Sequence, residues 1–149
     1  MTCQRQSILS NEKTLKREIM AVIRGIGVDV IDMQRIRTTI EEMGHAFLRK
    51  LFTEGEVAYC QSKRAPHQHF AARFAAKEAV SKALQTGWSG VFRWKDVEVV
   101  NEPSGAPKIL LHNDLAEVLS NCTVHLTISH TDTTVVAFAV IEEMPAPSG

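Results

Sequence analysis

The sequence lacks three features that would point to particular functions: an excess of charge of one sign, a long apolar run and clustered cysteines. Its 149 residues contain 17 Lys and Arg against 17 Asp and Glu, so global charge gives no case for binding nucleic acid or a membrane, and any anion site must be local. No apolar run reaches the ~18 residues of a membrane span. A hydrophobic content of 44% with 23% charged residues is that of an ordinary globular protein, and the length predicts one domain.

The three cysteines, Cys3, Cys60 and Cys122, lie far apart, with no CxxC and no His/Cys cluster. This spacing argues against a zinc site and against a disulfide framework, and it fits a reducing compartment. Residues 1–20 have neither an apolar core nor a small-residue cleavage site, so they do not resemble a secretory signal. The sequence therefore predicts a cytoplasmic protein.

Composition divides the chain into three parts. Residues 1–20 are polar and of mixed charge, and we expect an appended extension that is partly disordered. Residues 21–144 are expected to form the folded domain, and residues 145–149 a frayed tail. The chain has neither internal repeats nor low-complexity segments.

Helical and strand patterns interleave without a regular βα rhythm, which indicates the α+β class. The run AVIRGIGVDVI is typical of a buried strand, and Gly25 and Gly27 within it indicate a bulge or a close backbone approach. Asp32 is expected to cap the next helix, and Thr53 with Glu56 forms a capping-box pattern. The expected strands lie at 21–31, 96–100, 108–111, 125–131 and 135–143, and the expected helices at 33–42, 45–51, 54–61, 70–85 and 114–119.

Four expectations concern where helices begin and end. Gly44 is expected to break the first helix, and Pro66 to lie in a loop before the long helix at 70–85. Gly87 is a natural residue to follow the end of that long helix. Asn113 or Asp114 is expected to cap the last helix.

The stretch at 70–84, FAARFAAKEAVSKAL, concentrates the candidate chemistry. It is rich in alanine, contains no Gly or Pro and favours a helix. At 100° per residue its small residues share one face, where a neighbouring backbone can approach closely. The other half is expected to carry Arg73, Lys77, Glu78, Ser81 and Lys82. A solvated face with a Glu78–Lys82 pair is the plain alternative, but the excess of cations favours an anionic ligand.

Two carboxylates are candidates for metal binding. Asp29 lies in an otherwise apolar strand, where a buried carboxylate is costly unless it is paired or bound to a metal. A strand-end Asp that caps a turn is the alternative explanation. Together with Glu78 and several cations, Asp29 would suit Mg²⁺, which takes few protein ligands and keeps waters and phosphate oxygens.

His130, at the end of the strand HLTISHT, is the third candidate, with a structural histidine as the alternative. The other five histidines show no metal-ligand spacing. The GIG at 25–27 is no dinucleotide fingerprint, because Val30 occupies the third glycine position. A GxSxG nucleophile motif is absent.

Three motifs together resemble the holo-[acyl-carrier-protein] synthases, the small single-domain bacterial branch of the 4′-phosphopantetheinyl transferases. They are GIGVDVIDMQRI at 25–36, FAARFAAKEAVSKA at 70–83 with Thr86 and Gly87 after it, and GAPKI with HLTISHT. The similarity covers about residues 23–143. The longer, two-lobed relatives carry a further acidic residue two positions after the first Asp, where this chain has Ile31.

The resemblance implies an activity and roles for individual residues. The family transfers the 4′-phosphopantetheine arm of coenzyme A (CoA) to a serine of apo-acyl carrier protein and releases adenosine 3′,5′-bisphosphate; fatty-acid synthesis is its usual pathway. Asp29 and Glu78 match the Mg²⁺ ligands, and Lys77, Ser81, Lys82 and His130 match residues around the CoA phosphates. Arg73 matches a residue that contacts the adenosine 3′-phosphate. Arg35 matches an arginine that faces the acidic helix of the carrier protein. Gly105 and Pro107 match a turn near the nucleotide that is contributed across a subunit interface.

The resemblance also implies a homotrimer with sites between subunits. Three groups remain candidates for the base that takes the serine proton: Glu78, Asp29 acting through a metal-bound water, and His130. A family-like module that binds CoA or a carrier protein without catalysis is the alternative function. The complete set of Asp29, Glu78 and Lys82 argues against that alternative.

Overall fold

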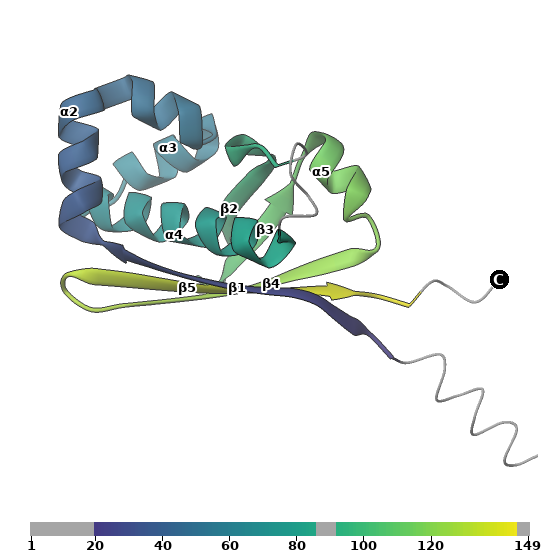
Figure 1. Ribbon diagram of the computed structural model, residues 1–149. Coiled ribbons are helices and arrows are strands. Elements are labelled where there is room, and N and C mark those ends of the chain that lie inside the picture. The colour runs from purple at the N-terminus through teal and green to yellow at the C-terminus, as the bar shows by residue number, and fades with distance from the viewer. Residues whose placement is uncertain (1–19, 86–91, 146–149) are drawn as a thin grey trace, which may run out of the picture.

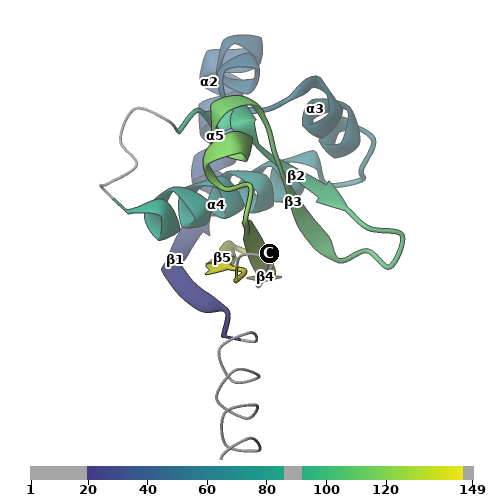
Figure 2. The same cartoon turned by 90° about the vertical axis from the view of Figure 1, so that its right-hand side faces the viewer.

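A long helix, α4 (Pro66–Leu84), crosses one face of a three-stranded antiparallel sheet in the computed structural model (Figure 1), which describes residues 20–85 and 92–145. The sheet has the strand order β1-β5-β4, and a separate hairpin pairs β2 with β3. In the two views, α4 lies between the three-stranded sheet and most of the remaining elements (Figure 1 and Figure 2). The other elements are β1 (Val22–Asp32), α2 (Met33–Leu51), α3 (Glu54–Gln61), η2 (Trp94–Asp96), β2 (Val97–Asn101), β3 (Pro107–Leu111), α5 (Asn113–Val118), β4 (Cys122–His130) and β5 (Thr134–Glu143).

The predicted α+β class, with a small antiparallel sheet and a long central helix, is confirmed. The expected extension and tail lie largely outside the described residues, as does Gly87. No helix in the described part of the chain is long and apolar enough to cross a membrane.

Glycines in β1 allow α4 to pack directly on the strand. A Cβ at Gly25 would lie 1.7 Å from the carbonyl oxygen of Ala83, and a Cβ at Gly27 would lie 1.9 Å from that of Ala79. Both alanines are buried on the face of α4 that meets the sheet. The predicted close backbone approach is therefore confirmed, and the register shift between Ile23 and Gly25 supplies the predicted irregularity as well.

Replacing Gly27 by Ala is expected to destabilise the fold by about 2–3 kcal/mol, because α4 must move away from β1 to admit the methyl group. Urea unfolding measures this loss. Gly55→Ala is the matched control: its Cβ would lie 3.2 Å from a carboxylate oxygen of Glu98, a side chain that can yield. Equal stability of the two variants would contradict the close packing.

The expected buried strand is buried on one face only. Gly25, Gly27 and Asp29 face α4, whereas the alternate residues point outward, with Ile26 57% and Val30 61% exposed. On the neighbouring strand, Phe138 pairs with Val28 and is also exposed. The outer face of the sheet is therefore largely apolar along β1 and β5, although it is exposed in a single chain.

Most predicted helix ends are confirmed. Asp32 caps α2 by accepting a hydrogen bond from Arg35 N, and Gly44, with φ +55°, kinks the helix. Thr53 and Glu56 form the predicted capping box of α3.

Two predicted helix ends are wrong. Pro66 is the first residue of α4 and does not lie in a loop, because its fixed φ and missing N–H suit the first helical position. Neither candidate caps α5: its cap residue is His112, and the Asn113 amide donates instead to Asp96, 2.6 Å away.

Candidate active site

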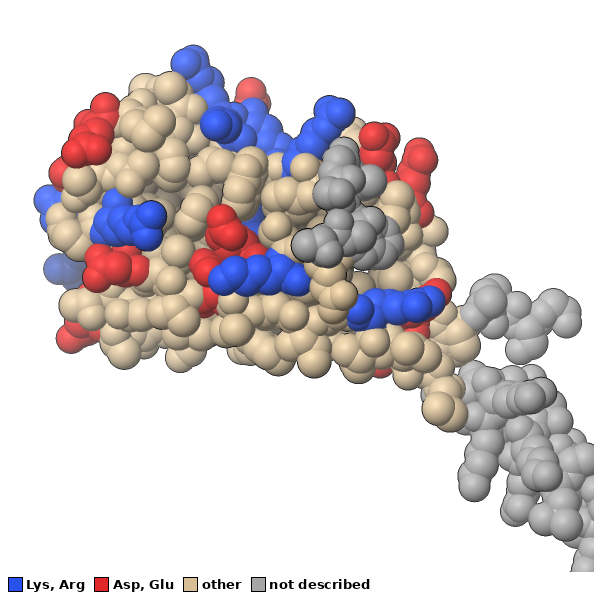
Figure 3. Space-filling model, viewed as in Figure 1, with Lys and Arg blue, Asp and Glu red and all other residues tan. Residues whose placement is uncertain are grey.

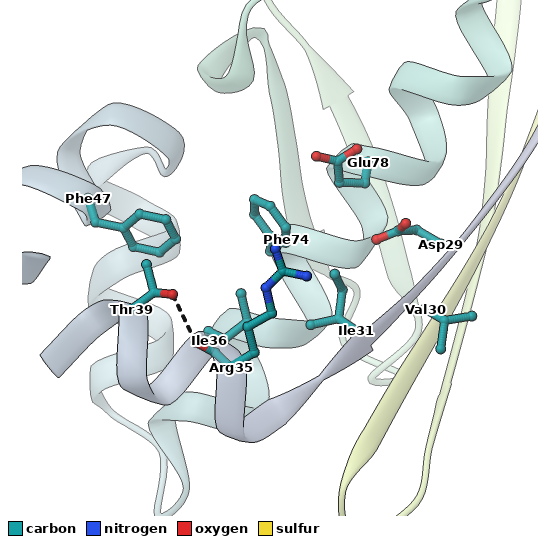
Figure 4. Close-up of a pocket in the computed structure, with 9 residues that line it drawn as sticks. All are labelled: Asp29, Val30, Ile31, Arg35, Ile36, Thr39, Phe47, Phe74 and Glu78. Atoms are coloured by element: carbon teal, nitrogen blue, oxygen red, sulfur yellow. Dashed lines mark hydrogen bonds between the residues drawn. The ribbon is translucent and has the colours of Figure 1, made fainter. Parts of the chain in front are cut away.

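Asp29 on β1 and Glu78 on α4 line the same cavity from neighbouring elements (Figure 4). Asp29 is only 9% exposed, and its Oδ1 accepts a hydrogen bond from Lys82 Nζ at 2.7 Å. The same ammonium donates to the carbonyl oxygen of Val28 at 3.1 Å. The second oxygen of Asp29, Oδ2, is buried and has no hydrogen-bond partner among the residues that the structure describes. The free lone pairs of Asp29 Oδ2 can therefore bind a ligand.

The two carboxylates affect each other's charge. Burial, followed by the negative charge of Asp29, raises the pKa of Glu78 above its ordinary value, and the positive charge of Lys82 opposes the rise. Two adjacent carboxylates with one shared cation leave a net negative site. This donor set fits Mg²⁺, which needs only one or two protein carboxylates. The described residues offer no group of three or more metal-ligating side chains, so zinc-type coordination has no support there.

The cavity beside the carboxylates has a volume of about 410 Å³. Arg35 projects over it from α2, and Phe47 and Phe74 form apolar walls (Figure 4). Phe74 also stacks on Trp94, with ring centroids 5.7 Å apart. The full lining comprises Asp29, Val30, Ile31, Arg35, Ile36, Thr39, Phe47, Phe74 and Glu78.

Lys77 does not belong to an exposed polar face. Its side chain is 0% exposed and forms a salt bridge of 2.9 Å with the equally buried Glu56. Its Nζ also donates to the carbonyl oxygens of Trp94 at 2.8 Å and Val97 at 2.6 Å, so all three ammonium protons have partners inside the protein. These partners favour a structural role for Lys77, and the contact to a CoA phosphate that the resemblance implies stays a prediction. Helical periodicity missed the partner because Glu56 lies on another helix.

Arg73, which helical periodicity places on the polar half of α4, is also buried, at 4% exposure. Its Nη2 donates to Asn101 Oδ1 at 3.0 Å, and its guanidinium lies 4.1 Å from the ring centroid of Tyr59. Within residues 20–85 and 92–145, its buried Nε has no hydrogen-bond partner. Lys63 Nζ lies 4.3 Å from the same ring. Sequence reasoning missed Tyr59 and Lys63. The only signal that their side chains could lie together was their spacing of four residues at the end of α3.

Three further predicted residues lie near Arg73. Asn101 donates to the carbonyl oxygen of Gly105 at 3.0 Å and pairs in register with Pro107, which ties the hairpin turn to Arg73. His130 is exposed at the end of β4 and contacts the Gln68 amide at 3.0 Å. Burial, then the positive charges of Arg73, Lys63 and His130, lower the pKa of His69, so these groups share one positively charged region.

The predicted residues thus form two groups within one chain. Asp29, Glu78, Lys82 and Arg35 gather at the cavity between β1, α2 and α4, whereas Arg73, Gly105, Pro107 and His130 gather around α3, the start of α4 and the hairpin. Ser81 is half-buried, one turn after Glu78.

The profile of the 4′-phosphopantetheinyl transferase superfamily matches residues 25–139, so the chain is a member of this class of protein. A curated holo-[acyl-carrier-protein] synthase of Koribacter versatilis is 42% identical over 125 residues, which are 82% of this chain and 100% of the relative. The crystal structure of holo-[acyl-carrier-protein] synthase from Neisseria meningitidis matches with a TM-score of 0.75 and 31% identity, over 82% of this chain and 100% of that one. The chain therefore belongs to the holo-[acyl-carrier-protein] synthase family.

A second solved relative carries a ligand. The holo-(acyl-carrier-protein) synthase of Bacillus anthracis, in complex with CoA (3′,5′-ADP), matches with a TM-score of 0.67 and 35% identity, over 81% of this chain and 97% of that one.

Proposed function

We propose that this chain transfers the 4′-phosphopantetheine group of CoA to a serine of apo-acyl carrier protein in a Mg²⁺-dependent reaction that releases adenosine 3′,5′-bisphosphate. Membership of the synthase family and the ligand of the Bacillus anthracis relative support the reaction and the substrate. The observation that carries the metal requirement is the unpartnered Asp29 Oδ2 opposite Glu78. When bound there, Mg²⁺ would neutralise pyrophosphate charge and favour departure of the leaving phosphate.

Residues of this chain would hold the substrate and the reacting groups in place. Lys82 holds Asp29 at 2.7 Å and adds positive charge where phosphate oxygens would lie. Glu78 is the best-placed base of the three candidates, because it faces the cavity and, among the described residues, its carboxylate accepts no hydrogen bond. Arg73, with His130 and the turn at Gly105 and Pro107, would hold the nucleotide end of CoA.

We further propose a homotrimer in which these two groups meet across subunit interfaces. Within one chain the carboxylates and the cluster around Arg73 use different elements, so a composite site would unite them. The exposed apolar face of the sheet, which includes Ile26, Val30 and Phe138, offers a surface for self-association. Size-exclusion chromatography with light scattering tests this: a monomer at micromolar concentration would contradict it.

The proposed setting is the cytoplasm, with a fatty-acid-synthesis carrier as the first acceptor to try. Among the described residues the cysteines Cys60 and Cys122 are free thiols, in keeping with a reducing compartment.

The decisive experiment is the intact mass of an apo-acyl carrier protein after incubation with this protein, CoA and Mg²⁺. A gain of one phosphopantetheine unit, lost with EDTA, is expected. No gain across several carrier proteins, with CoA still bound in a titration, would favour a non-catalytic binding module.

Mg²⁺ is expected to raise the melting temperature by about 5 °C at 100 times its dissociation constant, since it relieves the repulsion between Asp29 and Glu78. Differential scanning fluorimetry without substrate measures this. Glu78→Gln should abolish the shift, whereas Glu41→Gln, on the outside of α2, should retain it. A shift of equal size in both variants would place the ion elsewhere.

A further inference from the structure

Three side chains that can carry positive charge surround the ring of Tyr59 on α3. The guanidinium of Arg73 lies 4.1 Å from the centroid of this ring, and Lys63 Nζ lies 4.3 Å from it. The imidazole of His69 meets the same ring edge-on, with ring centroids 5.8 Å apart. We call Tyr59, Lys63, His69 and Arg73 the tyrosine cluster. One aromatic ring thus brings together groups from α3, α4 and the loop between them.

The cations of the tyrosine cluster have no counter-charge in the part of the chain that the structure describes. The salt bridges found there involve neither Lys63 nor Arg73. The charges that act on His69 are those of Arg73, Lys63 and, from the end of β4, His130, all of them positive. On the face seen in Figure 3, by contrast, Asp and Glu side chains lie beside Lys and Arg. Cations without a carboxylate suit an anionic ligand.

Arg73 also has a hydrogen-bond donor without an acceptor. Its side chain is 4% exposed, and its Nη2 donates to Asn101 Oδ1 at 3.0 Å. Among the described residues, its buried Nε has no partner. A buried N–H without an acceptor is costly, so an oxygen supplied by a ligand would be favoured there. Charge and hydrogen bonding therefore point to the same kind of ligand, an oxyanion.

His69 lies one helical turn before Arg73, so both side chains project from the same side of α4. Burial, followed by the positive charges of Arg73, Lys63 and His130, lowers the pKa of His69 below its ordinary value. The neutral imidazole therefore predominates at pH 7 in the free protein. A phosphate bound in the tyrosine cluster would act in the opposite direction, because a nearby negative charge favours the imidazolium.

We infer that His69 binds the phosphomonoester of CoA together with Arg73 and Lys63, and that it takes up a proton from solvent when CoA binds. This inference rests on the proposed function, which assigns the nucleotide end of CoA to Arg73. The 3′-phosphate is the one phosphomonoester of CoA, and it carries almost two negative charges at pH 7. His69 is thereby a further substrate-binding residue, with no part in the chemical step.

CoA should bind more tightly at lower pH. The pKa of His69 is lowered in the free protein, and the bound phosphate raises it. Affinity should therefore rise as pH falls from the pKa of the complex to that of the free protein, and His69 should have no effect on affinity outside this window. A rise of about one pKa unit corresponds to about tenfold tighter binding across the window and to about half a proton taken up at its middle.

Isothermal titration calorimetry of CoA in buffers of different ionisation enthalpy counts the protons taken up per CoA bound, with neither carrier protein nor Mg²⁺ present. Between about pH 6 and pH 7, the wild type should take up about half a proton more than His69→Gln. This comparison cancels the protonation change of the phosphate, because both proteins bind the same ligand. The matched control His45→Gln, which removes an exposed histidine of α2, should behave like the wild type.

Dephospho-CoA, which lacks the 3′-phosphate, identifies the group that supplies the negative charge. With this ligand, the difference in proton uptake between the wild type and His69→Gln should disappear. The wild type alone should also take up more protons with CoA than with dephospho-CoA, so the test does not depend on the folding of the variant.

Equal proton uptake by the wild type and His69→Gln would overturn the inference, as would a difference that persists with dephospho-CoA. A loss of affinity in His69→Gln that is the same at every pH would assign the residue a structural role and overturn it too. Transfer to a carrier protein together with equal proton uptake would refute the inference alone. Absence of CoA binding by the wild type would refute it together with the proposed function.

Discussion

Replacing Glu78 by Gln is expected to lower kcat/KM for transfer by about 10³-fold or more, equivalent to about 4 kcal/mol of transition-state stabilisation. The variant keeps the shape of the side chain but removes one of the two carboxylates that face the cavity. It removes a metal ligand and a candidate base together, so the loss should appear in kcat. The rate of appearance of adenosine 3′,5′-bisphosphate at saturating CoA and carrier measures it.

The same substitution should not destabilise the metal-free protein. The pKa of Glu78 is raised in the folded state by burial and by Asp29. A carboxyl group of this kind stabilises the fold most below its unfolded pKa, and this contribution is lost as pH rises through the folded pKa. Gln resembles the protonated form at every pH, so the variant should be as stable as the wild type, or more stable, at neutral pH. Activity near that of the wild type would exclude Glu78 from the reaction.

Local sequence signals predicted the framework of the site well. Gly25 and Gly27 indicated a close approach in β1, and an Asp in an apolar strand indicated a buried carboxylate with a special partner. Capping residues such as Asp32 and Thr53 placed helix starts to within a residue. These signals succeed for two reasons. Helix caps depend on residues that are neighbours in sequence, whereas the missing side chain of glycine and the cost of burying a charge are properties of single residues.

The errors arose where distant residues decide the environment. Helical periodicity placed Lys77 and Arg73 on the polar half of the helix, but both are buried, and their partners Glu56 and Asn101 come from α3 and β2. Likewise, the outer face of β1 is apolar like its core face, so composition alone could not show that it is exposed in one chain. The division of the site into two groups does not follow from any single motif.

The buried pair of Lys77 and Glu56 leads to the second large effect. Replacing Lys77 by Met is expected to reduce the free energy of unfolding by about 3–5 kcal/mol, because it leaves Glu56 buried without a counter-charge. Two carbonyl oxygens, those of Trp94 and Val97, would also lose their donor. Against a total stability of about 5–15 kcal/mol, this change would populate unfolded protein near 37 °C. Urea unfolding monitored by circular dichroism measures the loss.

A double-mutant cycle tests whether the lost charge pair causes this destabilisation. Glu56 also accepts hydrogen bonds from the backbone N–H groups of Thr53 and Val99, both at 2.9 Å, and Gln can retain one of them through its carbonyl oxygen. Glu56→Gln combined with Lys77→Met should therefore be less destabilising than the sum of the single changes, by about 1–3 kcal/mol. Arg37→Met, which breaks the exposed pair with Glu41, is the matched control and should cost less than about 1 kcal/mol.

The stability of Lys77→Met also decides between two roles for this lysine. If Lys77 held a CoA phosphate, as family resemblance implies, the variant would fold normally and KM for CoA would rise. If it joins α4 to α3 and β2, as its three internal partners indicate, stability falls while the folded fraction at 10 °C keeps its affinity for CoA. Since Glu78 is the next residue on the same helix, this buried ammonium would serve the reaction through position: it fixes the turn of α4 that brings the Glu78 carboxylate to the cavity it shares with Asp29.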